Sequence, residues 1–124
     1  ECLLQILAGL LRPAGNGRHI AASVANARAM VDDDPTMAWS LAELAREAGL
    51  SRYQLVRQFA QATGLTPHAY LVQRRLHHAR RLMRAGTPLA EVAAASGFAD
   101  QSHLTRLFAR SFGTTPHAYL RAHR

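Results

Sequence analysis

Residues 66–71 read TPHAYL, and residues 115–120 repeat the same six letters unchanged. The agreement extends backwards from the hexapeptide. With one extra residue near Ala99 set aside, 16 of the 31 positions in residues 41–71 are identical in residues 89–120. Such agreement between two stretches of one chain indicates two copies of one structural unit. The duplication therefore decides the organisation of the fold, and each copy helps to interpret the other.

The first copy carries two helix-start signals in close succession. Ser40 pairs with Glu43, and Ser51 pairs with Gln54, in the spacing of a capping box. Gly49 lies between them, where a turn needs a residue that tolerates the left-handed conformation. A short helix, a turn containing glycine and a second helix are the parts of a helix-turn-helix unit.

The second copy repeats this plan, with a short helix from Pro88, a turn at Gly97 and a cap at Asp100. The helix after this cap is predicted to run from Gln101 to Phe112. The apolar residues expected to face inward are Leu44, Ala45, Leu55, Phe59 and Ala62 in the first copy, and Val92, Ala93, Leu104 and Phe108 in the second. Each pair of helices is thus expected to lock through its own apolar face.

Helices are also predicted outside the two units. Thr66 and Pro67 indicate the start of a long linker helix that runs to about Ala85. Apolar residues at helical spacing predict another helix over residues 18–33. The fold is therefore expected to be all-α, with two tandem helix-turn-helix subdomains joined by a long linker helix and preceded by an N-terminal helical extension. The expected boundaries are 1–17 for a remnant of a preceding domain or linker and 18–124 for the domain that contains both units, itself divided into 18–64, 65–86 and 87–124.

The positive charge is concentrated in the last two-thirds of the chain, and every basic residue is an arginine. Residues 41–124 hold twelve arginines against four acidic residues, a net charge of +8, whereas residues 1–40 carry a net charge of −1. A basic domain attracts polyanions, among which nucleic acid is the commonest and an anionic membrane is the competing partner. The apolar residues 2–11 are too few to span a bilayer.

Three stretches resemble the signature of AraC/XylS-type bacterial transcription regulators. They read RLxxAxxLM at residues 75–83, LxxVAxxxGFxDxSxLxRxF at residues 89–108 and GxTPxxY at residues 113–119. The resemblance covers about residues 40–121. It implies a domain that binds promoter DNA through two helix-turn-helix subdomains. It also implies an effector-binding or dimerisation domain on the N-terminal side in the parent protein, with RNA polymerase as a further partner.

Base reading is expected on the side of each second helix that faces away from its apolar stripe. The candidate DNA-binding residues are Arg52, Tyr53, Val56 and Arg57 in the first copy, and Gln101, Ser102, His103, Thr105 and Arg106 in the second. Arginine can fork onto guanine, glutamine onto adenine, and the methyl groups of valine and threonine can touch thymine. Other arginines are expected to supply field or phosphate contacts, namely Arg74, Arg80, Arg81, Arg84 and Arg110. Arg75 is expected to form a structural ion pair, while Tyr70 and Tyr119 are expected in the core.

Enzymatic and metal-binding functions are not indicated. The sequence has no phosphate-cradling glycine loop, no nucleophile in a recognisable setting and no clustered carboxylates. No two histidines have the i, i+4 spacing of helical metal ligands, so no metal or other cofactor is expected. The single cysteine, Cys2, fits a reducing cytoplasm.

The function expected from these features is sequence-specific binding of double-stranded promoter DNA by a cytoplasmic regulator, with the two recognition helices in successive major grooves. Such a regulator can be an activator, as assigned here, or a repressor, and the sequence leaves both open. One alternative is a helical interaction module whose basic face binds an acidic protein. A second alternative is RNA binding, although the chain lacks the aromatic stacking platforms that single-stranded RNA recognition normally uses.

Overall fold

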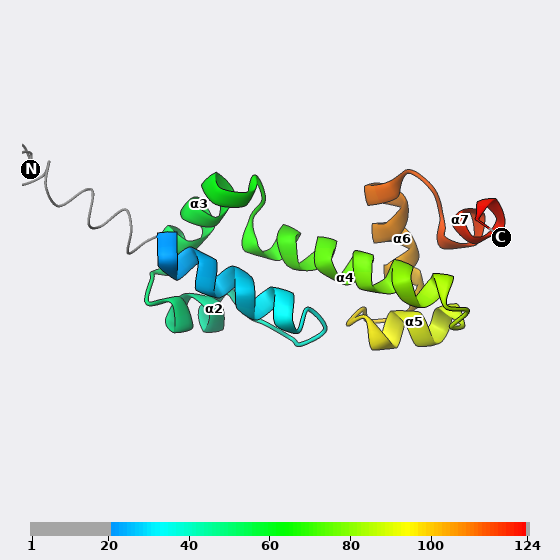
Figure 1. Ribbon diagram of the computed structural model, residues 1–124, viewed down its shortest axis with the longest axis horizontal. Coiled ribbons are helices and arrows are strands. Elements are labelled where there is room, and N and C mark those ends of the chain that lie inside the picture. The colour runs from blue at the N-terminus through cyan, green and yellow to red at the C-terminus, as the bar shows by residue number, and fades with distance from the viewer. Residues whose placement is uncertain (1–20, 124) are drawn as a thin grey trace, which may run out of the picture. The chain divides into compact units, whose positions relative to one another are not determined.

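The computed structural model describes residues 21–123, and every regular element within this range is an α-helix (Figure 1). The predictions for residues 1–17, for Cys2 and for the start of the helix expected over residues 18–33 concern parts of the chain outside the described residues. A helical segment covers residues 21–33. The helices that follow are α2 (Leu41–Ala48), α3 (Arg52–Thr63), α4 (Pro67–Arg84), α5 (Leu89–Ala95), α6 (Gln101–Phe112) and α7 (Pro116–Ala122). None of the described helices is both long enough and apolar enough to cross a membrane.

The all-α fold with tandem helix-turn-helix pairs is confirmed, since α2 contacts α3 and α5 contacts α6. The long helix α4 stands between the pairs in the chain and has 18 residues. By contacts between backbone positions, the described residues divide into a first unit of residues 21–30 and 40–67 and a second unit of residues 31–39 and 68–123. Nearly all of α4 belongs to the second unit. The domain limits at residues 17, 64 and 86 stay predictions.

The first unit is built on the capping boxes expected from its sequence. The Ser40 side chain accepts a hydrogen bond from the Glu43 backbone N–H, and the Glu43 carboxylate accepts one from the Ser40 N–H. This backbone hydrogen bond is the main cause that lowers the pKa of Glu43, and the Ser40 side chain adds to it. Gly49 then ends α2 in the left-handed conformation, with a φ of 72°.

Buried side chains hold the helices of the first unit together. Leu55 and Phe59 of α3 are fully buried, as is Ala27 of the preceding helical segment. That segment therefore packs within the first unit through its residues 21–30. Ala62 was expected on the same inward face of α3, but it is exposed. The expectation was wrong because the buried stripe of α3 ends one turn earlier, at Phe59.

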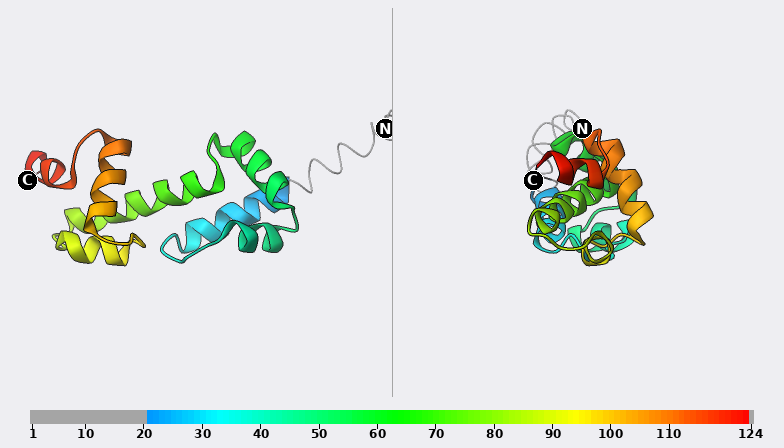
Figure 2. Two further views of the ribbon diagram at one scale, coloured as in Figure 1. Left: turned by 180° about the vertical axis from the view of Figure 1, so that it is seen from behind. Right: turned by 90° about the vertical axis from the view of Figure 1, so that its right-hand side faces the viewer.

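The helices α4, α5, α6 and α7 follow one another in the second unit (Figures 1 and 2). All four contribute side chains to one apolar core. Its buried members are Leu76, Ala79, Met83, Val92, Ala93, Phe98, Leu104, Phe108 and Tyr119. The α4 residues in this set, Leu76, Ala79 and Met83, recur at helical spacing, with Leu82 partly buried beside them. Pro88 has an extended backbone and lies just outside α5, which begins at Leu89 rather than at Pro88. Tyr70 and Tyr119 are both buried, as expected of repeated core positions.

Candidate nucleic-acid interface

The second helix of the first pair, α3, is fixed in orientation by its cap and its buried side. The Ser51 hydroxyl accepts from the Gln54 N–H at 3.0 Å, and the Gln54 side chain accepts from the Ser51 N–H at 2.9 Å. Leu55 and Phe59 hold the opposite side in the core. The candidate residues on this helix are therefore turned outward: Arg52, Tyr53 and Arg57 are exposed and Val56 is half-buried.

Tyr53 and Arg57 form a pair one helical turn apart on the exposed face of α3. Tyr53 is 71% exposed, which is unusual for a large aromatic side chain. Arg57 Nη1 donates to the Tyr53 hydroxyl at 3.3 Å, and Arg57 Cζ lies 5.9 Å from the ring centroid. The ring thus supports the guanidinium through a hydrogen bond and a weak cation–π contact. The result is a cation held above an outward-facing aromatic surface, which suits contact with an anionic ligand.

The second helix of the second pair, α6, is arranged in the same way. The Asp100 side chain accepts from the His103 N–H at 2.7 Å, which starts the helix at Gln101. Leu104 and Phe108 are fully buried. The opposite side exposes Gln101, Ser102 and Arg106, with Thr105 half-buried. Among the described residues Arg106 has no ion-pair or hydrogen-bond partner, so its guanidinium is available for a ligand.

His103 differs from the other candidates because its ring takes part in the turn before α6. The Ala99 N–H donates to His103 Nδ1 at 3.3 Å, and the ring meets Phe98 edge-on with centroids 5.5 Å apart. The side chain is half-buried. His103 therefore braces the α5–α6 turn, and a ligand could reach only the remaining edge of its ring.

The arginines of α4, expected to be sources of field or phosphate contacts, make more specific contacts within their own unit. Arg74 forms an ion pair with Asp32, with 3.2 Å between Nε and Oδ1. Arg80 lies over the Phe112 ring, with Cζ 4.8 Å from its centroid. Arg84 Nε donates to the Tyr119 hydroxyl at 2.7 Å. These arginines still contribute positive charge, but their geometry is set by packing, which sequence spacing alone could not show.

Arg75 was expected to form an ion pair, and this expectation was wrong in its choice of partner. Its Nε donates to the Pro35 carbonyl at 2.8 Å and its Nη2 to the Met37 carbonyl at 2.7 Å. Burial lowers the pKa of its guanidinium. The residue is structural, as predicted, but it binds backbone rather than a carboxylate. No local pattern could indicate these partners, because they lie 38 to 40 positions away in the chain.

Within residues 21–123, no three histidine, cysteine, aspartate or glutamate side chains lie close enough together to bind a metal ion. The nine candidate residues lie instead on two helices, five of them on α6 and four on α3. Exposed arginine, glutamine and hydroxyl groups on the second helix of a helix-turn-helix are the arrangement of a DNA-binding domain.

Comparison with known proteins agrees with this class. A family model described as "Helix-turn-helix domain" matches residues 44–122. A putative AraC-like transcription regulator of Streptomyces antibioticus is 35% identical over 99 residues, which are 79% of this chain and 30% of that protein. The uncharacterized HTH-type transcriptional regulator YbfI of Bacillus subtilis is 37% identical over 65 residues, which are 52% of this chain and 24% of that protein.

Among solved structures, this chain is similar to the DNA-binding domain of AdpA, a global transcriptional factor crystallised with a target DNA. The TM-score is 0.77 and the sequence identity is 30%, and the match covers 82% of this chain and 92% of that chain. The chain belongs to the AraC/XylS family of helix-turn-helix transcription regulators and corresponds to their DNA-binding domain. It spans about a quarter to a third of the length of the curated relatives named above. These relatives are transcription regulators rather than enzymes.

Proposed function

We propose that this chain binds double-stranded promoter DNA sequence-specifically and places α3 and α6 in successive major grooves on one face of the duplex. The observation that carries the proposal is the matching pair of outward faces: Arg52, Tyr53 and Arg57 on α3, and Gln101, Ser102 and Arg106 on α6. The likeness to the AdpA domain, which was solved with its target DNA, supports the same partner.

The length of α4 suits this arrangement. A helix of 18 residues is about 27 Å long at about 1.5 Å per residue. Successive major grooves on one face of B-DNA are about 34 Å apart. The length of α4 is therefore close enough to the groove spacing for both recognition helices to bind major grooves of one duplex at the same time.

The chemistry of the two faces predicts a non-palindromic site. Arg57 and Arg106 occupy equivalent positions and would each fork onto a guanine or bind a phosphate. Their neighbours differ, because Val56 in the first copy corresponds to Thr105 in the second. The α3 face therefore offers a methyl surface beside Tyr53, whereas the α6 face offers hydroxyl and amide groups that can hydrogen-bond to bases. His103 would contribute only from the edge of the α6 face.

The parent protein is proposed to act in the cytoplasm as a transcriptional activator that contacts RNA polymerase. The activator RhaS of Klebsiella pneumoniae, 42% identical over 62 residues, supports the direction of control. We also propose an effector-binding or dimerisation domain in the parent protein. The share of the curated relatives' length that this chain spans supports such a domain.

The proposal is tested by selecting binding sites from random duplexes. The affinity of the chain for the most enriched duplex is then measured by fluorescence anisotropy between roughly 50 and 200 mM salt. The expected site is non-palindromic and contains two blocks of preferred base pairs about one helical turn apart, one block read by α3 and the other by α6. Arg57→Ala should weaken the sequence preference within one block, and Arg106→Ala should weaken it within the other. Each variant should lose about 1–3 kcal/mol of binding free energy if the side chain reads bases. Arg46→Ala, on the exposed side of α2, is the control that should leave both blocks intact.

Two outcomes would overturn the proposal. Weak binding that depends only on salt, with no sequence enriched, would favour the alternative of an acidic protein partner for the basic face. Stronger binding to single-stranded RNA than to any selected duplex would favour the RNA alternative.

A further inference from the structure

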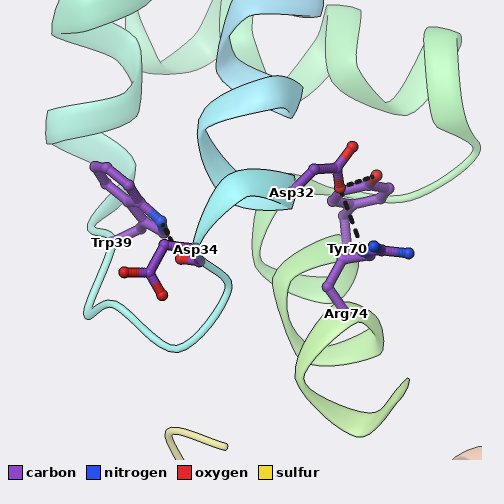
Figure 3. A network of polar contacts seen from close by, with 5 residues as sticks. All are labelled: Asp32, Asp34, Trp39, Tyr70 and Arg74. Carbon is purple, nitrogen blue, oxygen red and sulfur yellow. Dashed lines mark hydrogen bonds and ion pairs between the residues drawn. The ribbon is translucent and has the colours of Figure 1, made fainter. Parts of the chain in front are cut away.

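The loop of residues 34–39 joins the first helical segment to α2 in the chain, yet it is braced as part of the second unit. Asp34 Oδ1 accepts from the Thr36 hydroxyl at 2.7 Å and from the Thr36 N–H at 3.3 Å. The Trp39 indole N–H donates to the Asp34 carbonyl at 2.9 Å (Figure 3). Because the side chains of Asp34 and Trp39 bind backbone groups within the loop, the loop has a defined shape that another element can hold.

The start of this loop is anchored on α4. The Tyr70 hydroxyl donates to Asp32 Oδ1 at 2.6 Å, and Arg74 pairs with the same oxygen at 3.2 Å (Figure 3). Tyr70 is buried, so this contact is shielded from water on one side. Asp32 is thereby fixed to two successive turns of α4, and the chain enters the loop from a set position.

Arg75 closes the loop against the same helix. Its guanidinium donates to the carbonyls of Pro35 and Met37, at 2.8 and 2.7 Å. Both hydrogen bonds are charge-assisted, and the planar fork of arginine can reach two acceptors at once. Lysine has no equivalent geometry, because its ammonium is a single point at the end of a flexible chain.

The Arg75 guanidinium and the 34–39 loop both lie close against the turn between α5 and α6. Gly97 lies in this turn with a φ of 87°, and a Cβ atom there would stand 2.9 Å from Arg75 Nε and 3.2 Å from the Thr36 carbonyl oxygen. The corresponding glycine of the first pair, Gly49, has nothing within 4 Å of the same point. The contact is therefore a special feature of the second pair and does not belong to the helix-turn-helix plan itself.

We propose that Arg75 is a positioning residue for α6, which sets the recognition helix of the second pair by holding the 34–39 loop against Gly97. Only three residues separate Gly97 from Gln101, the first residue of α6, and one of them, Phe98, is buried in the core. A displacement of Gly97 would therefore be passed to Gln101 and Ser102, the exposed residues of the first turn. This inference rests on the proposed reading of DNA by α6.

The test uses the selected duplex and two derivatives in which either block is scrambled, with Arg75→Gln, Arg75→Lys and Arg81→Gln compared with the unchanged chain. Arg75→Gln should reduce the preference for an intact α6 block by about tenfold, the effect of a lost base contact. Its preference for the α3 block should stay within about twofold. Arg75→Lys, which can keep one of the two hydrogen bonds, should show a smaller loss at the same block.

Arg81→Gln is the matched control, because it removes one positive charge from α4, and the Arg81 guanidinium hydrogen-bonds to His78 rather than to a carbonyl of the loop. It should weaken binding to all three duplexes alike and leave both block preferences unchanged. Far-UV circular dichroism checks that each variant is folded. If Arg75→Gln is unfolded, Arg75→Lys decides the question alone.

Equal losses at both blocks, or no loss at either, would overturn the positioning role. So would a failure of both Arg75 variants to fold, because Arg75 would then serve the fold as a whole. If the unchanged chain prefers neither block, the proposed function fails first. The two failures are therefore distinguishable in one set of titrations.

Discussion

Ser96 shows how the two copies differ at a single buried position. It is fully buried, and its hydroxyl has no hydrogen-bond partner among the described residues. Ala48 occupies the equivalent place in the first pair, 48 positions earlier, and is also buried. A buried hydroxyl without a partner loses its hydrogen bonds to water and gains nothing in return.

Replacing Ser96 should therefore stabilise the chain. We expect Ser96→Ala to raise the free energy of unfolding by about 1 kcal/mol, measured by urea denaturation. Ser51→Ala makes a useful contrast because it removes a helix cap and should lower the same quantity by about 1 kcal/mol. A loss of stability in Ser96→Ala would show that its hydroxyl has a partner in solution.

Gly49 and Gly97 allow the contact at the second turn to be measured separately from backbone strain. Both have positive φ, at 72° and 87°, so alanine should cost about 1 kcal/mol at either position from strain alone. Gly97→Ala should cost at least about 1 kcal/mol more, because its methyl group would overlap Arg75 and the Thr36 carbonyl. The difference should shrink in an Arg75→Gln background, and equal costs in the unchanged background would refute the close contact.

At the scale of elements, α4 combines a core stripe with two adjacent histidine–arginine pairs. His77 Nδ1 lies 3.2 Å from Arg80 Nη2, and His78 Nδ1 lies 3.1 Å from Arg81 Nη2. Because arginine can only donate, each Nδ1 must accept and must therefore be unprotonated. The pKa values of both histidines are lowered, chiefly by burial and then by nearby arginines, although Asp34 partly offsets this at His78.

These pKa shifts predict that acid weakens the second unit. The two histidines bind protons less readily in the folded chain than in the unfolded chain. Their contribution to the free energy of unfolding is therefore fully present above the unfolded pKa, which is about 6.5. This contribution is lost as the pH falls through the lower pKa values of the folded chain. Thermal unfolding should thus show a Tm that decreases as the pH is lowered from about 7 through the unfolded pKa of about 6.5. The variant carrying both His77→Gln and His78→Gln should show a shallower decrease. The same slope in the variant and the unchanged chain would assign the effect to other groups.

Local signals predicted the elements well, and distant contacts explain what was missed. The capping boxes at Ser40 and Ser51 and the cap at Asp100 fixed the starts of three helices, because each cap involves residues only three positions apart. The place of the 34–39 loop in the second unit had no such signal, since Arg75 reaches its carbonyls across 38 to 40 positions. The candidate faces of α3 and α6 were predictable because they lie opposite the buried stripes.

At the scale of the whole chain, the excess of arginine sets how binding should depend on salt. Residues 41–124 carry a net charge of +8, and all of their cations are arginines. Each phosphate that the protein neutralises releases condensed counterions, so log affinity should fall linearly with log salt at about −0.9 per phosphate contact. This charge draws the chain to any duplex, whereas the outward faces of α3 and α6 are proposed to choose the sequence.

Removing a phosphate contact should change this slope without changing the preferred sequence. Arg110→Ala, which removes an exposed cation at the end of α6, should make the slope shallower by about one if Arg110 binds a phosphate. The measurement is an anisotropy titration at several salt concentrations on the intact and scrambled duplexes. An altered block preference with an unchanged slope would place Arg110 among the base-reading residues instead.

The central claim is that one chain reads two blocks on the same face of the duplex. It is tested most directly by inserting about five base pairs, roughly half a helical turn, between the blocks of the selected site and measuring affinity for the lengthened duplex. The account predicts a loss of at least about tenfold, to the affinity of a duplex with one block scrambled. An unchanged affinity would contradict it, because the two recognition helices could not then be held to successive grooves by α4.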